Sequence, residues 1–184
     1  MGRRRGYSAP VLPVGWLLFA VALAIVLTVW VMFTLTRLDR LHARVDAAWA
    51  ALDAQLVRRT AALLASAESP DSGLDRQRRT AVESVVHTAL AVSGDVERQE
   101  AENEVGRALT DLAATSASLP DATRAELTDT ANRVMIARRF YNDAVRDTRT
   151  LRARRMPRLL RLAGRRGMPQ FFDIDDTVPP VAGH

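Results

Sequence analysis

The sequence contains no cysteine and no lysine, and only 5% of its 184 residues are aromatic. The absence of cysteine excludes a disulfide framework, a thiolate metal site and a thiol nucleophile. The low aromatic content argues against a large β-sandwich, whose core depends on bulky side chains. Most apolar residues are instead Ala, Leu and Val, and Ala and Leu are strong helix formers. The composition therefore predicts an all-α protein.

Because lysine is absent, all 26 basic residues are arginine, a preference that genomic base composition is sufficient to explain. The arginines are unevenly distributed along the chain. Residues 138–166 contain eleven Arg and two Asp, a local charge of +9, whereas residues 67–132 contain six Arg and thirteen Asp or Glu, a local charge of −7. The net charge of +5 therefore conceals one basic and one acidic part of the chain.

Sequence motifs for catalysis are also absent. No P-loop, dinucleotide-binding glycine pattern or serine-nucleophile elbow occurs. The histidines, His42, His87 and His184, lie on different predicted elements, so they form no metal constellation, and we expect His42 and His87 at surfaces or helix edges. The sequence therefore predicts no enzymatic activity, no catalytic, metal-binding or cofactor-binding residue, and no cofactor.

A long apolar stretch lies near the N-terminus. Residues 11–36 contain no charged side chain, and a helix of this length exceeds the ~30 Å hydrocarbon core of a bilayer. Trp16 and Trp30 lie towards its ends, where indole rings favour the membrane interfaces. A cleaved signal peptide is the alternative, but its apolar region is only about 7–15 residues long. We therefore predict a single transmembrane helix at 11–36, preceded by a basic tail at 1–10.

The arginines near this stretch do not fix its orientation by number, since three precede it and three follow it. A short basic tail is costly to translocate, whereas long domains cross largely regardless of charge. We therefore favour a plasma-membrane protein with an internal N-terminus and an external domain.

Apolar residues after this stretch recur at steps of three and four, the spacing of amphipathic helices. The periodic stretches run from Leu38 to about Ser66, from about Asp75 to Val92, from Asp95 to near Ser116, and from Asp121 or Thr123 onward. Turn-forming residues at 68–74, the stop at Ser93-Gly94 and the pair Leu119-Pro120 separate them. Residues 37–156 are thus predicted to form an antiparallel up-and-down four-helix bundle. Trp49 and Tyr141 are expected to fill its core.

The remaining residues, 157–184, are predicted to form a basic amphipathic segment and a flexible tail. Pro157 can start a short helix whose apolar residues share one face, with Phe171 and Phe172 as further membrane anchors. In an up-and-down bundle of four helices the first helix leaves the membrane and the fourth runs back towards it, so this end is expected near the lipid headgroups. The arginines expected to contact lipid are Arg152, Arg154, Arg155, Arg158, Arg161, Arg165 and Arg166. An ordinary solvated helix end with a loose tail is the alternative.

Three stretches of the chain resemble motifs of the LemA family of bacterial membrane-anchored helical proteins. Residues 45–59 (VDAAWAALDAQLVRR) are similar to the family's V-x-x-A-W-x-x-I-D-x-Q-L-x-R-R. Residues 101–112 are similar to A-E-N-x-L-x-x-A-L-x-x-L, and residues 132–145 are close to the family's E-N-R-I-x-x-A-R-x-x-Y-N-x-x-V, from its Asn onward. The resemblance implies membrane attachment and a helical fold, and it assigns structural motif roles to Trp49, Asp53, Gln55, Arg58, Arg59, Asn103, Asn132, Arg133, Arg138, Tyr141 and Asn142.

The sequence also departs from the family pattern, since residues 61–66 replace a Pro-Asn-containing stretch and Thr148-Arg149 replaces a second Tyr-Asn. The resemblance implies a fold much more clearly than an activity.

Our preferred hypothesis is a membrane-anchored scaffold or adaptor that presents its bundle surface to a protein partner. The alternative is a ligand-sensing bundle. Membrane lipid and an unidentified protein are the expected partners, a homo-oligomer is compatible with the sequence, and no nucleic acid is expected because no stacking pattern or nucleic-acid motif occurs.

Overall fold

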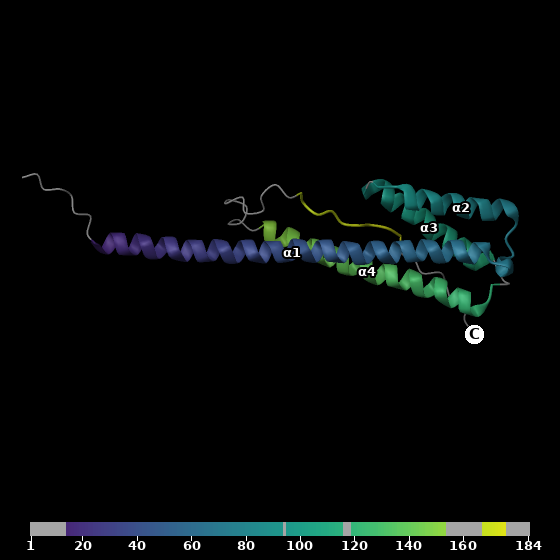
Figure 1. Ribbon diagram of the computed structural model, residues 1–184, viewed down its shortest axis with the longest axis horizontal. Coiled ribbons are helices and arrows are strands. Elements are labelled where there is room, and N and C mark those ends of the chain that lie inside the picture. The colour runs from purple at the N-terminus through teal and green to yellow at the C-terminus, as the bar shows by residue number, and fades with distance from the viewer. Residues whose placement is uncertain (1–13, 94, 116–118, 154–166, 176–184) are drawn as a thin grey trace, which may run out of the picture.

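The structure is a computed structural model that describes residues 14–93, 95–115, 119–153 and 167–175. Its elements are α1 (Val14–Glu68), the 3-10 helix η1 (Pro70–Ser72), α2 (Arg76–Ala91), α3 (Asp95–Thr115) and α4 (Asp121–Ala153). These described ranges contain no β-strand. The all-α fold class is therefore confirmed, and Figure 1 shows α1 extending well beyond the other helices.

α1 is one uninterrupted helix of 55 residues, which corresponds to about 80 Å at ~1.5 Å per residue. Its most apolar 18-residue stretch has a mean hydropathy of 2.6, and only 6% of that stretch is buried. Figure 1 shows the N-terminal half of α1 projecting away from the remaining helices. α1 is thus long and apolar enough to cross a membrane. A signal sequence has a similar composition, but this helix continues without a break to Glu68.

Local signals end α1 within the predicted turn at 68–74. The Ser69 side chain accepts a hydrogen bond from the Asp71 amide, and Pro70 begins η1. Gly73 has a φ of 64°, a left-handed conformation that glycine adopts easily because it lacks a Cβ. Asp75 then caps α2 by accepting from the Arg78 amide at 2.8 Å. These features start α2 in a new direction.

Two apolar clusters hold the helices together. The first joins the end of α1 to α2, α3 and the start of α4, and consists of Leu63, Ala67, Val82, Val86, Ala89, Ala101, Val105, Leu109, Leu112, Leu119 and Leu127. The second joins the middle of α1 to α4 and the C-terminus, and consists of Val45, Leu52, Leu56, Val134, Tyr141, Ala144, Val145, Phe172 and Ile174. The apolar stripes seen in the sequence therefore supply most of the core.

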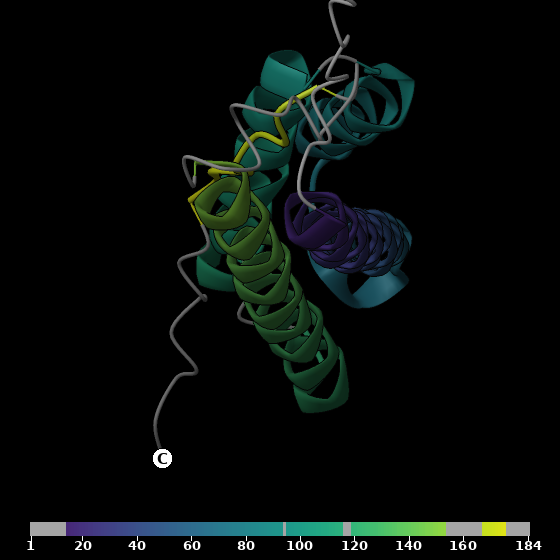
Figure 2. The same cartoon turned by 90° about the vertical axis from the view of Figure 1, so that its left-hand side faces the viewer.

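α4 packs mainly along α1, and Leu127 near its start also joins the cluster that contains residues of α2 and α3. Leu127, near the start of α4, clusters with Leu63, near the end of α1. Arg44, close to the apolar stretch of α1, pairs with Asp147 near the end of α4 at 3.0 Å. In the end-on view of Figure 2, α4 and α2 lie on different sides of α1. α4 therefore ends beside the part of α1 that emerges from the candidate span.

Residues 167–175 differ from the predicted flexible tail with membrane-anchoring phenylalanines. They lie against the helices, and Phe172 and Ile174 are only 2% and 5% exposed. The physical reason is that both side chains leave water when they join the second cluster. Phe171 remains exposed. The predicted short helix after Pro157 lies outside the described residues.

Candidate functional site

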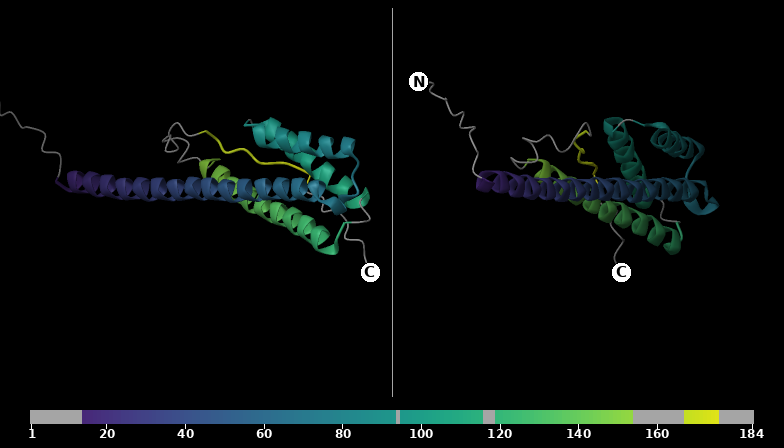
Figure 3. Two further views of the ribbon diagram at one scale, coloured as in Figure 1. Left: turned by 45° about the vertical axis from the view of Figure 1, so that its right-hand side comes forward. Right: turned by 60° about the vertical axis from the view of Figure 1, so that its left-hand side comes forward.

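Side chains from several helices converge on residues 167–175, which we call the C-terminal segment. The segment contains neither helix nor strand. Figures 2 and 3 show that it starts beside the end of α4 and passes towards α3. Its contacts with the helices come from side chains of α1, α3 and α4.

Two neighbouring side chains of α4 bind the backbone of the segment. The Asn142 Nδ2 donates to the carbonyl oxygen of Phe172, and the Asn142 Oδ1 accepts from the amide nitrogen of Phe172, both at 3.0 Å. An adjacent β-strand satisfies both backbone groups of one residue in a similar way. The Tyr141 hydroxyl donates to the carbonyl oxygen of Gln170 at 2.8 Å, as its partly buried position requires. Asn142 therefore makes the two hydrogen bonds to Phe172 that a neighbouring β-strand would otherwise make.

Two amide side chains of α3 continue this pattern. The Gln99 Oε1 accepts from the Asp173 amide, and the Asn103 Oδ1 accepts from the Asp175 amide, both at 2.8 Å. Residues four apart lie on one face of a helix, so α3 presents both amides to the same strip of backbone. The four backbone-binding side chains, which we call the clamp, are Gln99, Asn103, Tyr141 and Asn142.

Apolar side chains anchor the segment between the clamp residues. The Phe172 ring lies 5.4 Å from the Trp49 ring, centroid to centroid, at an interplanar angle of 67°. Trp49 in turn lies 5.4 Å from Tyr141. Phe172 and Ile174 are buried whereas Asp173 is exposed, the alternation of an extended chain with one face on a core. The prediction that Trp49 and Tyr141 help to fill the core is consistent with these contacts.

Three arginines of α4 lie along the segment, and each contacts it differently. Arg138 pairs with Asp173 at 3.4 Å, Arg149 lies 5.0 Å from the centroid of the Phe171 ring, and Arg152 donates to the carbonyl oxygen of Gly167 at 2.7 Å. We call these three residues the arginine row. They place positive charge beside a segment that carries two Asp.

A buried ion-pair network lies behind the clamp and joins α1 to α3. Arg59 donates through Nη2 to the Glu102 carboxylate and to the Glu102 carbonyl oxygen, both at 2.9 Å. Arg98 binds the same carboxylate at 3.1 Å and reaches Asp53 on α1 at 2.8 Å. Because Glu102 lies between the two amide residues of α3, the network fixes the position of that half of the clamp relative to α1.

Gly106, one turn beyond Asn103 on α3, gives the segment room. A Cβ at this position would lie 3.6 Å from the carbonyl oxygen of Asp175 and 3.9 Å from Nη1 of Arg59. The backbone of the segment thus passes in van der Waals range of α3. Any side chain longer than a methyl group would occupy the same space.

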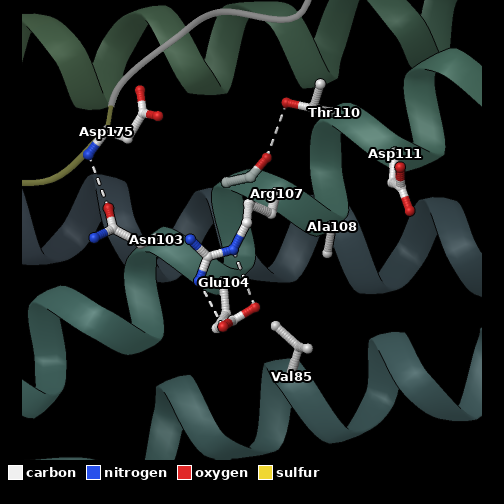
Figure 4. A pocket seen from close by; sticks show the side chains of 9 residues that line it. Val85, Asn103, Glu104, Arg107, Ala108, Thr110, Asp111 and Asp175 are labelled. Atoms are coloured by element: carbon white, nitrogen blue, oxygen red, sulfur yellow. Dashed lines mark hydrogen bonds and ion pairs between the residues drawn. The ribbon is translucent and has the colours of Figure 1, made fainter.

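The end of the segment borders a pocket of ≈ 530 Å³ that is lined mainly by α3, together with Val85 of α2. Figure 4 shows Asn103 and Asp175 at one side of the lining residues and the ion pair of Glu104 and Arg107 in their middle. The hydrogen bond from Arg107 lowers the pKa of Glu104. Both side chains are exposed, so this is a solvated polar surface and not an enclosed site.

A second pocket, of ≈ 430 Å³, lies between the segment and α1. Aromatic side chains of both partners line it, together with His42. We expected His42 at a surface or helix edge, but it is only 7% exposed, because α1 turns it inward beneath the segment. Its Nδ1 contacts the Leu38 carbonyl oxygen at 2.8 Å, whereas its Nε2 is buried without a hydrogen-bond partner among the described residues.

Most residues of the LemA-like motifs lie either against the C-terminal segment or in the buried ion-pair network. Trp49, Asn103, Arg138, Tyr141 and Asn142 contact the segment, and Asp53 and Arg59 belong to the ion-pair network. The others lie apart: Arg58 is exposed, Arg133 pairs with Asp129 at the surface, Asn132 is half-buried, and the buried Gln55 Oε1 has no partner within the described ranges.

Sequence reasoning did not single out Gln99, Arg98 or Glu102, and it predicted Phe172 only as a membrane anchor. Two signals were available. The amides of Gln99 and Asn103 share one helix face, and residues 171–175 (FFDID) alternate apolar and acidic side chains after Phe171. Neither signal identifies the helix that receives the segment, since that depends on how α3 and α4 pack on α1.

Of the arginines predicted to contact lipid, only Arg152 belongs to the described part of the chain, and it binds the segment through Gly167. Arg154, Arg155, Arg158, Arg161, Arg165 and Arg166 lie outside the described residues. The prediction of lipid contact stays a prediction.

Among the described residues, shifted pKa values are resolved for Glu104, Arg107 and Arg133, which are all exposed surface groups. Within the same residues, no three His, Cys, Asp or Glu side chains are grouped to hold a metal ion. The clamp and its buried ion pairs are therefore the main polar constellation in the described part of the chain. Comparison of the chain with protein-family models, with curated proteins and with solved structures finds no match.

Proposed function

We propose that this protein is a membrane-anchored scaffold or adaptor of the LemA type, whose helical body binds protein through the surface formed by α1, α3 and α4. The observation that carries the proposal is the binding of the segment backbone by side chains of the clamp. Recognition of a polypeptide main chain by fixed side chains is one way in which an adaptor can bind its partner. The projecting apolar half of α1 supplies the anchor.

The proposal includes an antiparallel up-and-down bundle and a single span in the plasma membrane, with the body on the external side. Leu127 near the start of α4 packs with Leu63 near the end of α1, whereas Asp147 near the end of α4 pairs with Arg44, earlier in α1. These two contacts support opposite directions for α1 and α4. Because α1 is continuous, the body is held at a fixed distance and angle from the span. A partner bound to the body would therefore be held close to the membrane.

Site-specific photo-crosslinking in intact membranes tests the adaptor function. The photoreactive residue is placed in the full chain at one of three exposed positions, Asp46 on α1 beside the clamp, Phe140 on α4 or Leu90 on α2. We expect discrete protein adducts from Asp46, and fewer from Leu90. A chain that gives no protein adduct from any of the three positions is not an adaptor.

Lipid contact by the basic end is a separate part of the proposal. Attraction to an anionic leaflet is worth about 1 kcal/mol per Arg close to the surface. The body without α1's apolar stretch, with and without residues 152–166, is mixed with neutral and with anionic liposomes. We expect binding only to anionic liposomes and only with residues 152–166 present. Equal binding in all four mixtures rejects lipid contact.

One observation favours a second candidate function, the sensing of a small ligand. The pocket of ≈ 430 Å³ has aromatic walls from Trp49, Tyr141 and Phe172, and the buried Nε2 of His42 has no partner among the described residues. If His42 Nδ1 donates to the Leu38 carbonyl, Nε2 is an acceptor in the neutral ring and would bind a ligand hydroxyl or N–H group. Thermal unfolding of the full chain and of His42→Phe with a library of aromatic alcohols tests this. A ligand that stabilises both proteins equally does not use this pocket.

A further inference from the structure

We propose that the groove between α3 and α4, with Trp49 of α1 at its base, is a binding site for an extended acidic segment of a partner protein. The partner's apolar side chains would alternate with carboxylates. The C-terminal segment occupies this groove in cis and competes with the partner. This inference rests on the adaptor function proposed above, since it names the partner class and the device that regulates its binding.

The clamp recognises features that every extended polypeptide shares. It makes five hydrogen bonds to the segment, and all five go to backbone groups, those of Gln170, Phe172, Asp173 and Asp175. None of these bonds depends on the side chains of the bound segment. A different polypeptide can therefore make the same bonds if its backbone is extended, as in the addition of a peptide strand to a sheet edge.

The sequence preference of the groove comes from alternate positions. The sites occupied by Phe172 and Ile174 are apolar and enclosed, so they accept aromatic or aliphatic side chains. The intervening Asp173 faces Arg138, and Arg149 and Arg152 carry further positive charge along the same side. Carboxylates between the two apolar residues thus match the charge of the arginine row.

The walls of the groove are held by contacts that do not involve the segment. Arg59 and Glu102 hold α3 on α1, and Leu63 and Leu127 pack α4 against α1 at the far end. The segment also leaves space, because the pocket of ≈ 430 Å³ remains between residues 167–172 and α1. A partner with larger side chains at the positions of Met168 and Pro169 would fill this space better than the chain's own residues.

Competition follows from the covalent connection between α4 and the segment. Arg152 contacts Gly167, so the segment begins where α4 ends and occupies the groove without being drawn from a second copy. A tethered ligand has a high effective concentration because its binding is intramolecular. A free partner segment must overcome this advantage, so the full chain is expected to bind it weakly.

The experiment uses a fluorescent peptide with the sequence GMPQFFDID, identical to residues 167–175, and measures its anisotropy with protein in detergent micelles. The proteins are the full chain and a chain that ends at Arg166. We expect the shortened chain to bind the peptide at least about tenfold more tightly than the full chain, because the cis competitor is removed. Asn142→Ala in the shortened chain should reverse this gain, whereas Asn132→Ala, on the same helix, should leave it intact.

Two controls test the chemistry of the ligand. The peptide GMPQFDFDI has the same composition, but its apolar and acidic residues are exchanged between the two faces, and we expect it not to bind. Raising the salt concentration from about 50 mM to about 500 mM should weaken binding of the original peptide, because the arginine row is screened. Equal binding of both peptides overturns the proposed sequence preference.

A second variant covers the case in which the shortened chain does not fold, as judged by far-UV circular dichroism. Phe172→Asp with Ile174→Asp in the full chain removes the buried anchors of the segment and should free the groove to the same extent. If the full chain, the shortened chain and this variant bind equally, the segment is no competitor. If none binds, the groove takes no peptide in trans, while protein adducts from Phe140 would still support an adaptor that uses another surface.

Discussion

Arg59 on α1 and Glu102 on α3 form a buried ion pair at 2.9 Å, with side chains that are 3% and 2% exposed. Arg98 binds the same carboxylate from one turn earlier on α3. Glu102 is next to the clamp residue Asn103 on α3, so this ion pair holds that part of the clamp in position against α1. Buried charges are costly unless each has its partner, which makes the pair sensitive to single substitutions.

Removal of one member of this ion pair should destabilise the protein strongly. Arg59→Met leaves Glu102 in the core with Arg98 as its remaining charged partner among the described residues, and such a loss costs about 3–5 kcal/mol. The double variant Arg59→Met with Glu102→Leu should recover part of this loss. Urea unfolding of the full chain in micelles, followed by circular dichroism, measures both. The control is Arg133→Ala, which breaks the exposed pair with Asp129 and should cost less than about 1 kcal/mol.

Loss of the Asn142 amide should loosen the C-terminal segment. Asn142→Ala removes two hydrogen bonds worth about 0.5–1.5 kcal/mol each, so we expect amide exchange at Phe172 to rise about 5- to 150-fold. Hydrogen exchange read by mass spectrometry on the peptide containing residues 167–175 measures this. Asn132→Ala provides the matched control. Unchanged exchange in Asn142→Ala would show that the two hydrogen bonds do not hold the segment.

Gly106 should tolerate a methyl group but no larger side chain. A Cβ there meets the Asp175 carbonyl oxygen at an ordinary contact distance of 3.6 Å, and Ala favours a helix by up to about 1 kcal/mol over Gly. Gly106→Ala should therefore keep or raise stability with the segment in place. Gly106→Leu should expose the segment to limited proteolysis. Equal protection of residues 167–175 in the two variants would contradict this placement of the backbone.

A charge in the middle of the apolar stretch should impair membrane insertion. Leu23 is exposed on the projecting half of α1, and Arg at the centre of a spanning helix costs about 2.5–3.5 kcal/mol on insertion scales. Leu23→Arg should therefore lower the fraction of protein that resists alkaline extraction from membranes. Leu90→Arg, an exposed position on α2, should not. A soluble helix would show no difference between these variants.

The hydrogen bond from Arg107 holds the pKa of Glu104 below its ordinary value. Because the folded-state pKa is lowered, the small stabilisation is present above the unfolded pKa and is lost as the pH falls through the folded pKa. Arg107→Ala should raise the pKa of Glu104 towards its ordinary value. Carboxylate chemical shifts from an NMR titration measure the change, with Arg133→Ala as a control that leaves Glu104 unaffected.

The sequence indicated the helices because their signals are local. The charge-free stretch at 11–36, the turn at 68–74 and the Asp75 cap depend on residues near one another in the chain, and the structure places helix ends within a few residues of the predicted positions. Asn103 and Asn142 were also singled out from the sequence, but only as members of a resemblance, whereas Trp49 and Tyr141 were predicted from the sequence as core residues as well.

Tertiary structure alone decided what those residues do. Asn142 and Phe172 are 30 residues apart, and Asn103 and Asp175 are 72 apart, so no local pattern pairs them. The pairing depends on the direction in which α4 returns along α1 and on the face that α3 turns towards it. Local propensities and apolar periodicity set the helices of this protein, whereas the burial of Phe172 and the pairing of Arg59 with Glu102 arise only when those helices pack, because both require partners from distant parts of the chain.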